Sequence, residues 1–214
     1  MAAEGIITRI DEVDLLDITH RGAVADVWLH HPVTLPQKRV LTSGCAGGVT
    51  FSDLAAARPP LNIDRPITPD QILALMGQLQ AAANLYRRSQ GVHTSALSDG
   101  TRLLAVAEDV GRHNTLDKIR GACLQQNIPT AGNILLTTGR VSSEMLHKAA
   151  GMQTPVIVSR TSPTSLSLAL AQAWNITLIG YARGRRMRVY SGEHRFGLPL
   201  RAGSANGHRA SPPS

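Results

Sequence analysis

The sequence predicts an α/β protein in which helices cover a mostly parallel sheet, with a smaller β-rich part before it. From about residue 66 onward, short apolar runs of strand length alternate with helical stretches, which is typical of a parallel sheet with helices on its faces. The residues before this point hold only short β-type runs and loops. We therefore expect a partial β-rich domain over residues 1–65, an α/β domain over 66–200 and a disordered Gly/Ser/Pro-rich tail over 201–214.

The individual elements follow in chain order. Thr68-Pro69-Asp70 predicts the start of a helix, because it combines a capping hydroxyl, a proline at the first helical position and an early acid. Apolar residues at helical spacing continue this helix to Tyr86, and Gly91 is expected to end it. A hairpin turning at Ser98-Asp99-Gly100 and a helix from Arg112 to about Gln126 come next. The short β-type runs of the first part are Ile6–Ile10, Ala25–Leu29 and Arg39–Leu41.

The composition of the 214 residues favours an anionic small molecule as the binding partner. The formal net charge is +7, but the arginines gather at predicted strand ends and near the C-terminus rather than in one basic run. Aromatic residues make up only 3%, too few for the base-stacking platforms of RNA- and single-strand-binding proteins, so we expect no nucleic-acid partner. The sequence shows no signal-type segment and no apolar run long enough to span a bilayer, so we expect a cytoplasmic protein with no membrane partner.

Four predicted strands end in turns that each carry an arginine. The first, Leu103–Ala107, runs into Glu108–Lys118, a turn that holds several polar side chains suited to a charged ligand, among them Arg112, His113 and Asn114. The next three strands end at Arg140, Arg160 and Arg183. Ligands of open α/β sheets bind where strands end at their carboxyl edge, so we expect a convergent anion site there. The alternative is a solvated loop followed by a polar helix face.

The two cysteines have different surroundings. Cys45 stands in the glycine-rich segment Thr42–Thr50, where the absence of neighbouring side chains exposes a thiol that can act as a nucleophile or accept sulfur as a persulfide. The alternative is a small hydrophobic residue in a tight turn. Cys123 lies in an apolar helical stretch, so we expect it in the core. The two thiols form neither a disulfide framework nor a zinc spacing, which suits a reducing compartment.

Zinc-dependent nucleobase deamination is a rival chemistry that the residues argue against. Such enzymes carry H-x-E at one helix start and P-C-x-x-C at the next. This chain has His93-Thr94-Ser95, without the glutamate, and Pro163-Thr164-Ser165, without the cysteines, so we expect no zinc. His93 is expected to cap the preceding helix or to pack. The hydroxyls of Ser162, Thr164 and Ser165, which open a predicted helix at a strand end, favour a phosphate instead.

Four segments resemble the formate dehydrogenase accessory sulfurtransferase family, FdhD: Gly91–Leu97, Glu108–Lys118, Gly139–Glu144 and Ser162–Thr164. The match runs in order from about Ala3 to Tyr190. The resemblance implies a cytoplasmic sulfurtransferase that passes persulfide sulfur from a cysteine desulfurase to the molybdenum cofactor, bis-molybdopterin guanine dinucleotide, before insertion into formate dehydrogenase. It also implies a homodimer and a three-layer domain resembling the cytidine deaminase fold without its zinc.

The resemblance also assigns site residues. Cys45 matches the persulfide-forming cysteine of the family, and the segment assigned to the cofactor is matched by Tyr181, Ala182, Arg183, Gly184, Arg185 and Arg186. The cofactor phosphates and rings are expected to contact Arg112, His113, Asn114, Arg140 and Arg160 as well. Two departures stand out: position 48 is glycine where the family often has a second cysteine, and Glu4-Gly5-Ile6-Ile7 stands at the start, where the family has several dozen residues before it.

Two other functions remain open from the sequence. A non-catalytic chaperone for the molybdenum cofactor would bind the same ligand with Cys45 serving only the structure. A guanine-nucleotide-binding regulator would bind free nucleotide rather than the cofactor.

Overall fold

The structure is a computed structural model that describes residues 6–22, 24–33 and 58–197. Cys45 with its glycine loop, and the expected β-type run Arg39–Leu41, lie outside the described residues. No helix in the described ranges is long and apolar enough to cross a membrane.

Six strands form one mixed sheet in the spatial order β4-β3-β5-β6-β7-β8. The strands are β3 (His93–Ser98), β4 (Leu103–Asp109), β5 (Ile134–Thr137), β6 (Val156–Ser159), β7 (Thr177–Arg183) and β8 (Arg186–Ser191). The only parallel pairs in this sheet are β5–β6 and β6–β7, whereas β3 is antiparallel to both its neighbours and β8 is antiparallel to β7. The prediction of a mostly parallel sheet was therefore wrong, because a hairpin on each side adds antiparallel strands to a short parallel centre.

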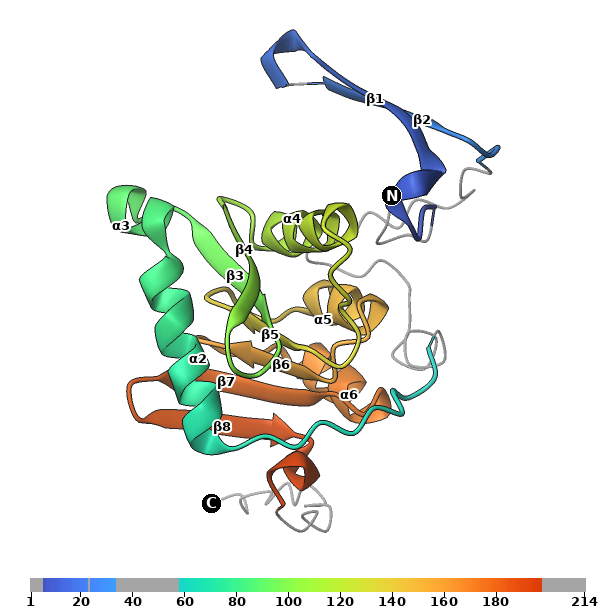
Figure 1. Ribbon diagram of the computed structural model, residues 1–214. Helices are drawn as coiled ribbons and strands as arrows, with labels where there is room; N and C mark the ends of the chain where they lie inside the picture. Colours follow the sequence, from blue (N-terminus) through green and yellow to red (C-terminus); the bar gives the residue numbers. More distant parts are fainter. Residues whose placement is uncertain (1–5, 23, 34–57, 198–214) are drawn as a thin grey trace, which may run out of the picture.

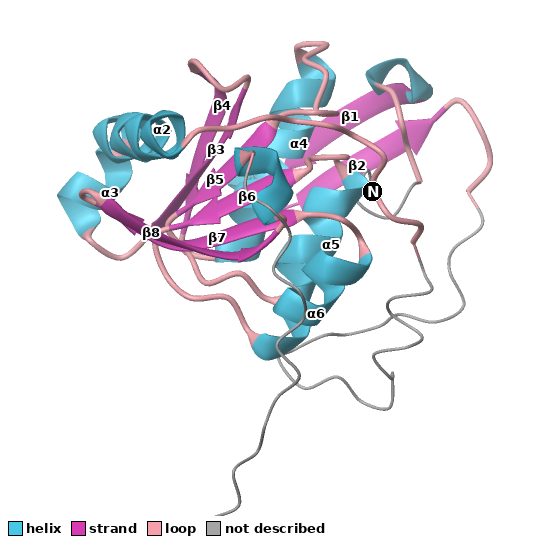
Figure 2. Ribbon diagram, turned by 90° about the horizontal axis from the view of Figure 1, so that it is seen from below, coloured by secondary structure: helices cyan, strands magenta, loops and turns pink. Residues whose placement is uncertain are grey.

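Helices cover both faces of this sheet and make three layers (Figures 1 and 2). One face is covered by α2 (Pro69–Ala82) and the other by α4 (Arg112–Gln125), α5 (Ser143–Gly151) and α6 (Ser165–Ala173). Each face has its own apolar cluster, in which alternate residues of the strands take part. Leu135 packs on the α4 side and Leu136 on the α2 side, as the period of two in a strand requires. We refer to these faces below as the α4 side and the α2 side.

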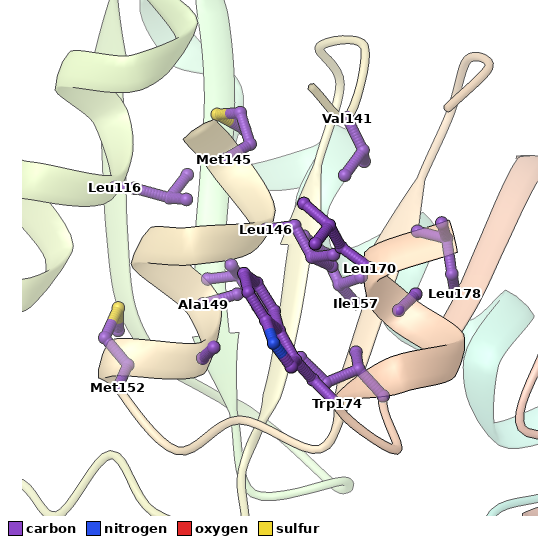
Figure 3. Packing of buried hydrophobic residues seen from close by; sticks show 14 of the residues in the cluster. Leu116, Val141, Met145, Leu146, Ala149, Met152, Ile157, Leu170, Trp174 and Leu178 are labelled. Carbon is purple, nitrogen blue, oxygen red and sulfur yellow. The ribbon is translucent and has the colours of Figure 1, made fainter. Parts of the chain in front are cut away.

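The larger core lies on the α4 side around Trp174. Figure 3 shows the indole with Leu146 and Ala149 of α5 and with Leu170 of α6. Trp174 is 1% exposed, and Cys123 in α4 is buried in the same cluster, as predicted for that thiol. Burying such side chains contributes roughly 1.5–3 kcal/mol each to the stability of the α/β body.

The start of α2 was predicted correctly, but its end was not. Thr68 accepts a hydrogen bond from the amide of Gln71 and forms a capping box with it, a local pattern that sequence alone reveals. The helix breaks at Ala83 rather than at Gly91, and a second helix, α3 (Asn84–Ser89), follows and ends at Gln90 in the left-handed conformation. A residue of β4 stabilises the break, because the Glu108 carboxylate accepts hydrogen bonds from the backbone amides of Leu85 and Tyr86 in α3.

The first described segment forms a two-stranded antiparallel ribbon of β1 (Val13–Thr19) and β2 (Val24–Leu29), which projects away from the α/β body in Figure 1. The predicted run Ala25–Leu29 is confirmed as part of β2. The predicted run Ile6–Ile10 is not a strand: a 3-10 turn, η2 (Ile10–Glu12), forms there because the Glu12 carboxylate accepts hydrogen bonds from two preceding amides. Leu61 and Ile67 hydrogen-bond to Trp174 and Arg195, which ties the connection before α2 to the α/β body.

Candidate ligand site at the strand ends

The strand register brings the predicted arginine turns to one edge of the sheet. His93, at the start of β3, pairs with Asp109 at the end of β4. The parallel strands β5, β6 and β7 end at the same edge, since Thr137 pairs with Ser159 and antiparallel β3 begins beside β5. The edge therefore carries all four turns that the sequence singled out.

The turn after β4 is held largely by its own side chains. The Asp109 carboxylate pairs with Lys118 at 2.6 Å and accepts hydrogen bonds from the Gly111 amide at 2.7 Å and the Asn114 side-chain amide at 3.1 Å. These contacts, with that of Lys118 the strongest, lower the pKa of Asp109 to about 2. Asn114 was predicted as a ligand contact. Its side-chain amide instead donates to Asp109 and stabilises the turn that positions Arg112.

Arg112, the first residue of α4, packs against the glycine that follows β5. A Cβ built on Gly139 would lie 2.9 Å from Arg112 Cβ and 3.4 Å from Arg112 Cδ, so only glycine leaves room for this arginine. The Arg112 Nε atom is buried and has no hydrogen-bond partner within the described part of the chain. The Nε atoms of Arg58 and Arg195 are buried without a partner in the same way, but Arg112 is the one that stands at the strand ends, where a ligand oxygen would satisfy it. Arg140 directly follows Gly139 and is exposed.

His113 lies deeper on the same side. Its Nε2 is 3.0 Å from the Ser142 hydroxyl and 3.5 Å from the Glu144 carboxylate. Burial lowers the pKa of His113, and the Glu144 charge opposes this effect. Because Ser142 also caps α5, His113 joins the starts of α4 and α5 through its Nε2 atom.

A layer of hydroxyl groups supports the α4 side of the edge. Ser95 Oγ lies 2.7 Å from Thr115 Oγ1 and donates to Thr137 Oγ1 at 2.9 Å, and Thr137 Oγ1 accepts the Gly139 amide. Ser159 Oγ donates to the Gly139 carbonyl at 2.7 Å. These residues were not identified from the sequence. A signal was present for Thr137 and Ser159, because each is a hydroxyl residue that ends an apolar strand.

A separate cavity opens on the α2 side of the same edge. Its volume is about 190 Å³, and its polar wall is formed by Thr138, Arg160 and Arg183. The rest of its lining comes from α2 and the end of β7: Leu73, Met76, Gly77, Leu79, Gln80, Ala182 and Gly184. The predicted arginines therefore meet at one edge but occupy two sides, with Arg112 on the α4 side and Arg160 and Arg183 on the α2 side.

The end of β7 has an unusual backbone. Tyr181 has a φ of 53°, a left-handed conformation that bulky residues adopt rarely, and its amide donates to the Thr161 carbonyl at 3.0 Å. The irregularity shifts the β7–β8 register between Gly180 and Arg183. Six other non-glycine residues among those described also have a positive φ, so the backbone at Tyr181 does not by itself mark a site. The Tyr181 side chain is exposed, and Arg185 and Arg186 continue along the exposed tip.

Other polar groups at the edge are engaged in the fold. Thr164, whose hydroxyl was expected to favour a phosphate, caps α6 by accepting the Ser167 amide. Within the described ranges, no group of three or more His, Cys, Asp or Glu side chains is placed to hold a metal ion.

Comparisons with known proteins relate nearly the whole chain to one family. The model of the FdhD/NarQ family matches residues 1–197. Two proteins named sulfur carrier protein FdhD, from Staphylococcus haemolyticus and Staphylococcus aureus strain MRSA252, are each 36% identical over 203 residues, which cover 92% of this chain and 76% of theirs. A crystal structure assigned to a formate dehydrogenase accessory protein from Desulfotalea psychrophila is similar with a TM-score of 0.70 and 28% identity, over 90% of this chain and 74% of that one.

Proposed function

This chain belongs to the FdhD/NarQ family, and from that premise we propose that it is a sulfur carrier that supplies the molybdenum cofactor destined for formate dehydrogenase. The names of its relatives support sulfur transport and a role in formate dehydrogenase function. The finer parts of the proposal are a cysteine desulfurase as the sulfur donor and bis-molybdopterin guanine dinucleotide as the substrate.

One observation carries the assignment of the substrate: a single sheet edge presents cationic groups on two sides. Arg112 and Arg140 lie near His93 on the α4 side, and Arg160 and Arg183 line the cavity on the α2 side. The proposed substrate carries two guanine dinucleotide arms, each with a pyrophosphate. Each side would hold one pyrophosphate through charge-assisted hydrogen bonds, the geometry for which arginine is best suited.

Cys45 would carry the sulfur. Its thiolate attacks the terminal sulfur of the donor persulfide, a new S–S bond forms, and the donor cysteine leaves as a thiolate. Release of that sulfur as sulfide requires a second thiol to attack the Cys45 sulfur, which leaves a mixed disulfide. Because position 48 is glycine, that thiol would come from a small-molecule thiol or a partner protein.

The test of sulfur transport is the mass of the intact protein after incubation with a cysteine desulfurase and cysteine. We expect the gain of one sulfur atom, lost in Cys45→Ala and kept in Cys123→Ala. Equal labelling of both thiols, or labelling of neither, would overturn the sulfur-carrier function. Cofactor binding without sulfur transfer would select the chaperone, and binding of free GTP but not of the cofactor would select the nucleotide-binding regulator.

Further parts of the proposal rest on the family alone. They are the likeness of the α/β body to the cytidine deaminase fold, the homodimer and the cytoplasmic location. Binding by Tyr181 to Arg186, and by His113 and Asn114, belongs to the same set of proposals.

A further inference from the structure

His93 contacts the same point on the sheet edge as Arg112. Its Nδ1 lies 3.5 Å from the position that a Cβ on Gly139 would occupy, and Cδ of Arg112 lies 3.4 Å from that position. The strands are fixed there, since Thr94 and Thr138 exchange hydrogen bonds between β3 and β5. His93 is therefore held beside the arginine whose Nε lacks a partner in the described structure.

The charges that face His93 come from three elements. Arg112 approaches from α4, Arg140 from the turn after β5, and Asp109 is the cross-strand neighbour in β4. The Asp109 carboxylate is already engaged by Lys118 and by two hydrogen-bond donors. Burial and the nearby charges of Arg112 and Arg140 lower the pKa of His93, so the uncharged imidazole is favoured at neutral pH.

We propose that His93 binds the same oxyanion as Arg112 and Arg140, donating a neutral N–H hydrogen bond at neutral pH and taking up a proton as the anion binds at lower pH. The inference rests on the proposed function, in which this edge binds a phosphate-bearing ligand. A third arginine here would increase repulsion in the empty site, whereas an imidazole adds a donor without adding charge. An anion beside the ring offsets the two guanidiniums, so the protonated form becomes favoured on binding.

The probe for this proposal is P1,P2-di(guanosine-5′) diphosphate, in which each phosphate has one ester bond, one anhydride bond and no proton to exchange near pH 6. Titration calorimetry at about pH 6, in two buffers of different ionisation enthalpy, measures the protons taken up on binding. We expect uptake in the native protein and none in His93→Gln. The affinity of the native protein should rise about threefold from pH 8 to pH 6, while that of His93→Gln stays constant.

His147→Gln is the matched control. His147 is another half-buried histidine with a lowered pKa, but it lies on α5 beside Arg58 and Trp174, away from the edge. Its substitution should leave the proton uptake unchanged. If His93→Gln does not fold, the His93 ring is followed in the native protein by NMR, and its pKa should rise when the probe binds.

The outcomes separate the inference from the proposed function. Binding of the probe without proton uptake, equal uptake in His93→Gln, or a His93 pKa that does not change on binding would overturn the role of His93 and leave the proposed function intact. Failure of the native protein to bind the probe would overturn the anion site and the role of His93 together.

Discussion

Arg112 and Gly139 are in direct contact across the gap between α4 and the end of β5. The space that a Cβ at position 139 would need is taken by Arg112, whose own Cβ would lie only 2.9 Å away. Arg112 therefore occupies this position only because residue 139 has no side chain. The position of the Arg112 side chain thus depends on the residue that follows β5.

Gly139→Ala should move Arg112 and the first turn of α4 away from the edge. A charge-assisted hydrogen bond contributes roughly 1.5–3 kcal/mol, so its loss should weaken binding of the diguanosine diphosphate about tenfold or more. Calorimetry measures the change.

Gly121→Ala is the control for this substitution. Gly121 lies in the same helix, and a Cβ there would have no atom within 4 Å. The alanine should stabilise the protein by about 0.5–1 kcal/mol and leave binding unchanged. Unchanged affinity in Gly139→Ala would show that Arg112 does not contact the ligand.

The two-sided edge predicts two binding sites for a probe that carries one diphosphate. Calorimetry should give two probe molecules per native chain, with Arg112→Ala removing the one on the α4 side and Arg183→Ala the one on the α2 side. Arg102→Ala is the control, because Arg102 lies in the β3–β4 turn at the opposite edge, where its nearest carboxylate is Asp99. A single site that both substitutions weaken equally would contradict the division into two sides.

The sequence predicted the local features of the fold, including the hairpin of β3 and β4 at Ser98-Asp99-Gly100, and missed the pairing of strands that lie far apart in the chain. Thr68 and Gln71 form a capping box within four residues, so their pattern is sufficient to locate the start of α2. By contrast, the antiparallel pairing of β3 with β5 joins residues about forty positions apart, and nothing in either strand determines its direction. The helix break at Ala83 similarly depends on Glu108, a residue from another element.

The candidate site shows the same division. The arginine-bearing strand ends were predicted to converge, and the register of the sheet brings them to one edge. The sequence did not indicate that Arg112 and Arg183 lie on different sides of the sheet. The side depends on how each strand alternates up to its last residue and on the path of the turn that follows it. It also indicated no ligand role for His93, whose contact with Gly139 arises only when β3 pairs with β5.

Asp109→Asn should reduce stability in a pH-dependent manner. Its lowered pKa means that the ionised carboxylate stabilises the folded state above the unfolded pKa of about 3.9, and that this stabilisation is lost as the pH falls toward 2. Solvent screening reduces the contribution to about 1 kcal/mol. Urea unfolding should therefore show the native protein more stable than the variant at pH 6, with the difference shrinking as the pH falls from about 5 to 3. A difference that is constant with pH would show that the ion pair with Lys118 contributes nothing.

Cys123 should be unreactive until the protein unfolds. It is 1% exposed, so a reagent cannot reach the thiol in the folded protein. Burial also raises the pKa of the thiol, which lowers the fraction present as the reactive thiolate. In the Cys45→Ala variant Cys123 is the only thiol, and a disulfide reagent that reports each thiol by absorbance should label it fully in denaturant. In native buffer, labelling should be slow and should accelerate with urea in parallel with unfolding. Rapid labelling of the native variant would contradict this prediction and would mean that the α4 side opens locally. Sulfur found on Cys123 in the desulfurase experiment could then come from folded protein.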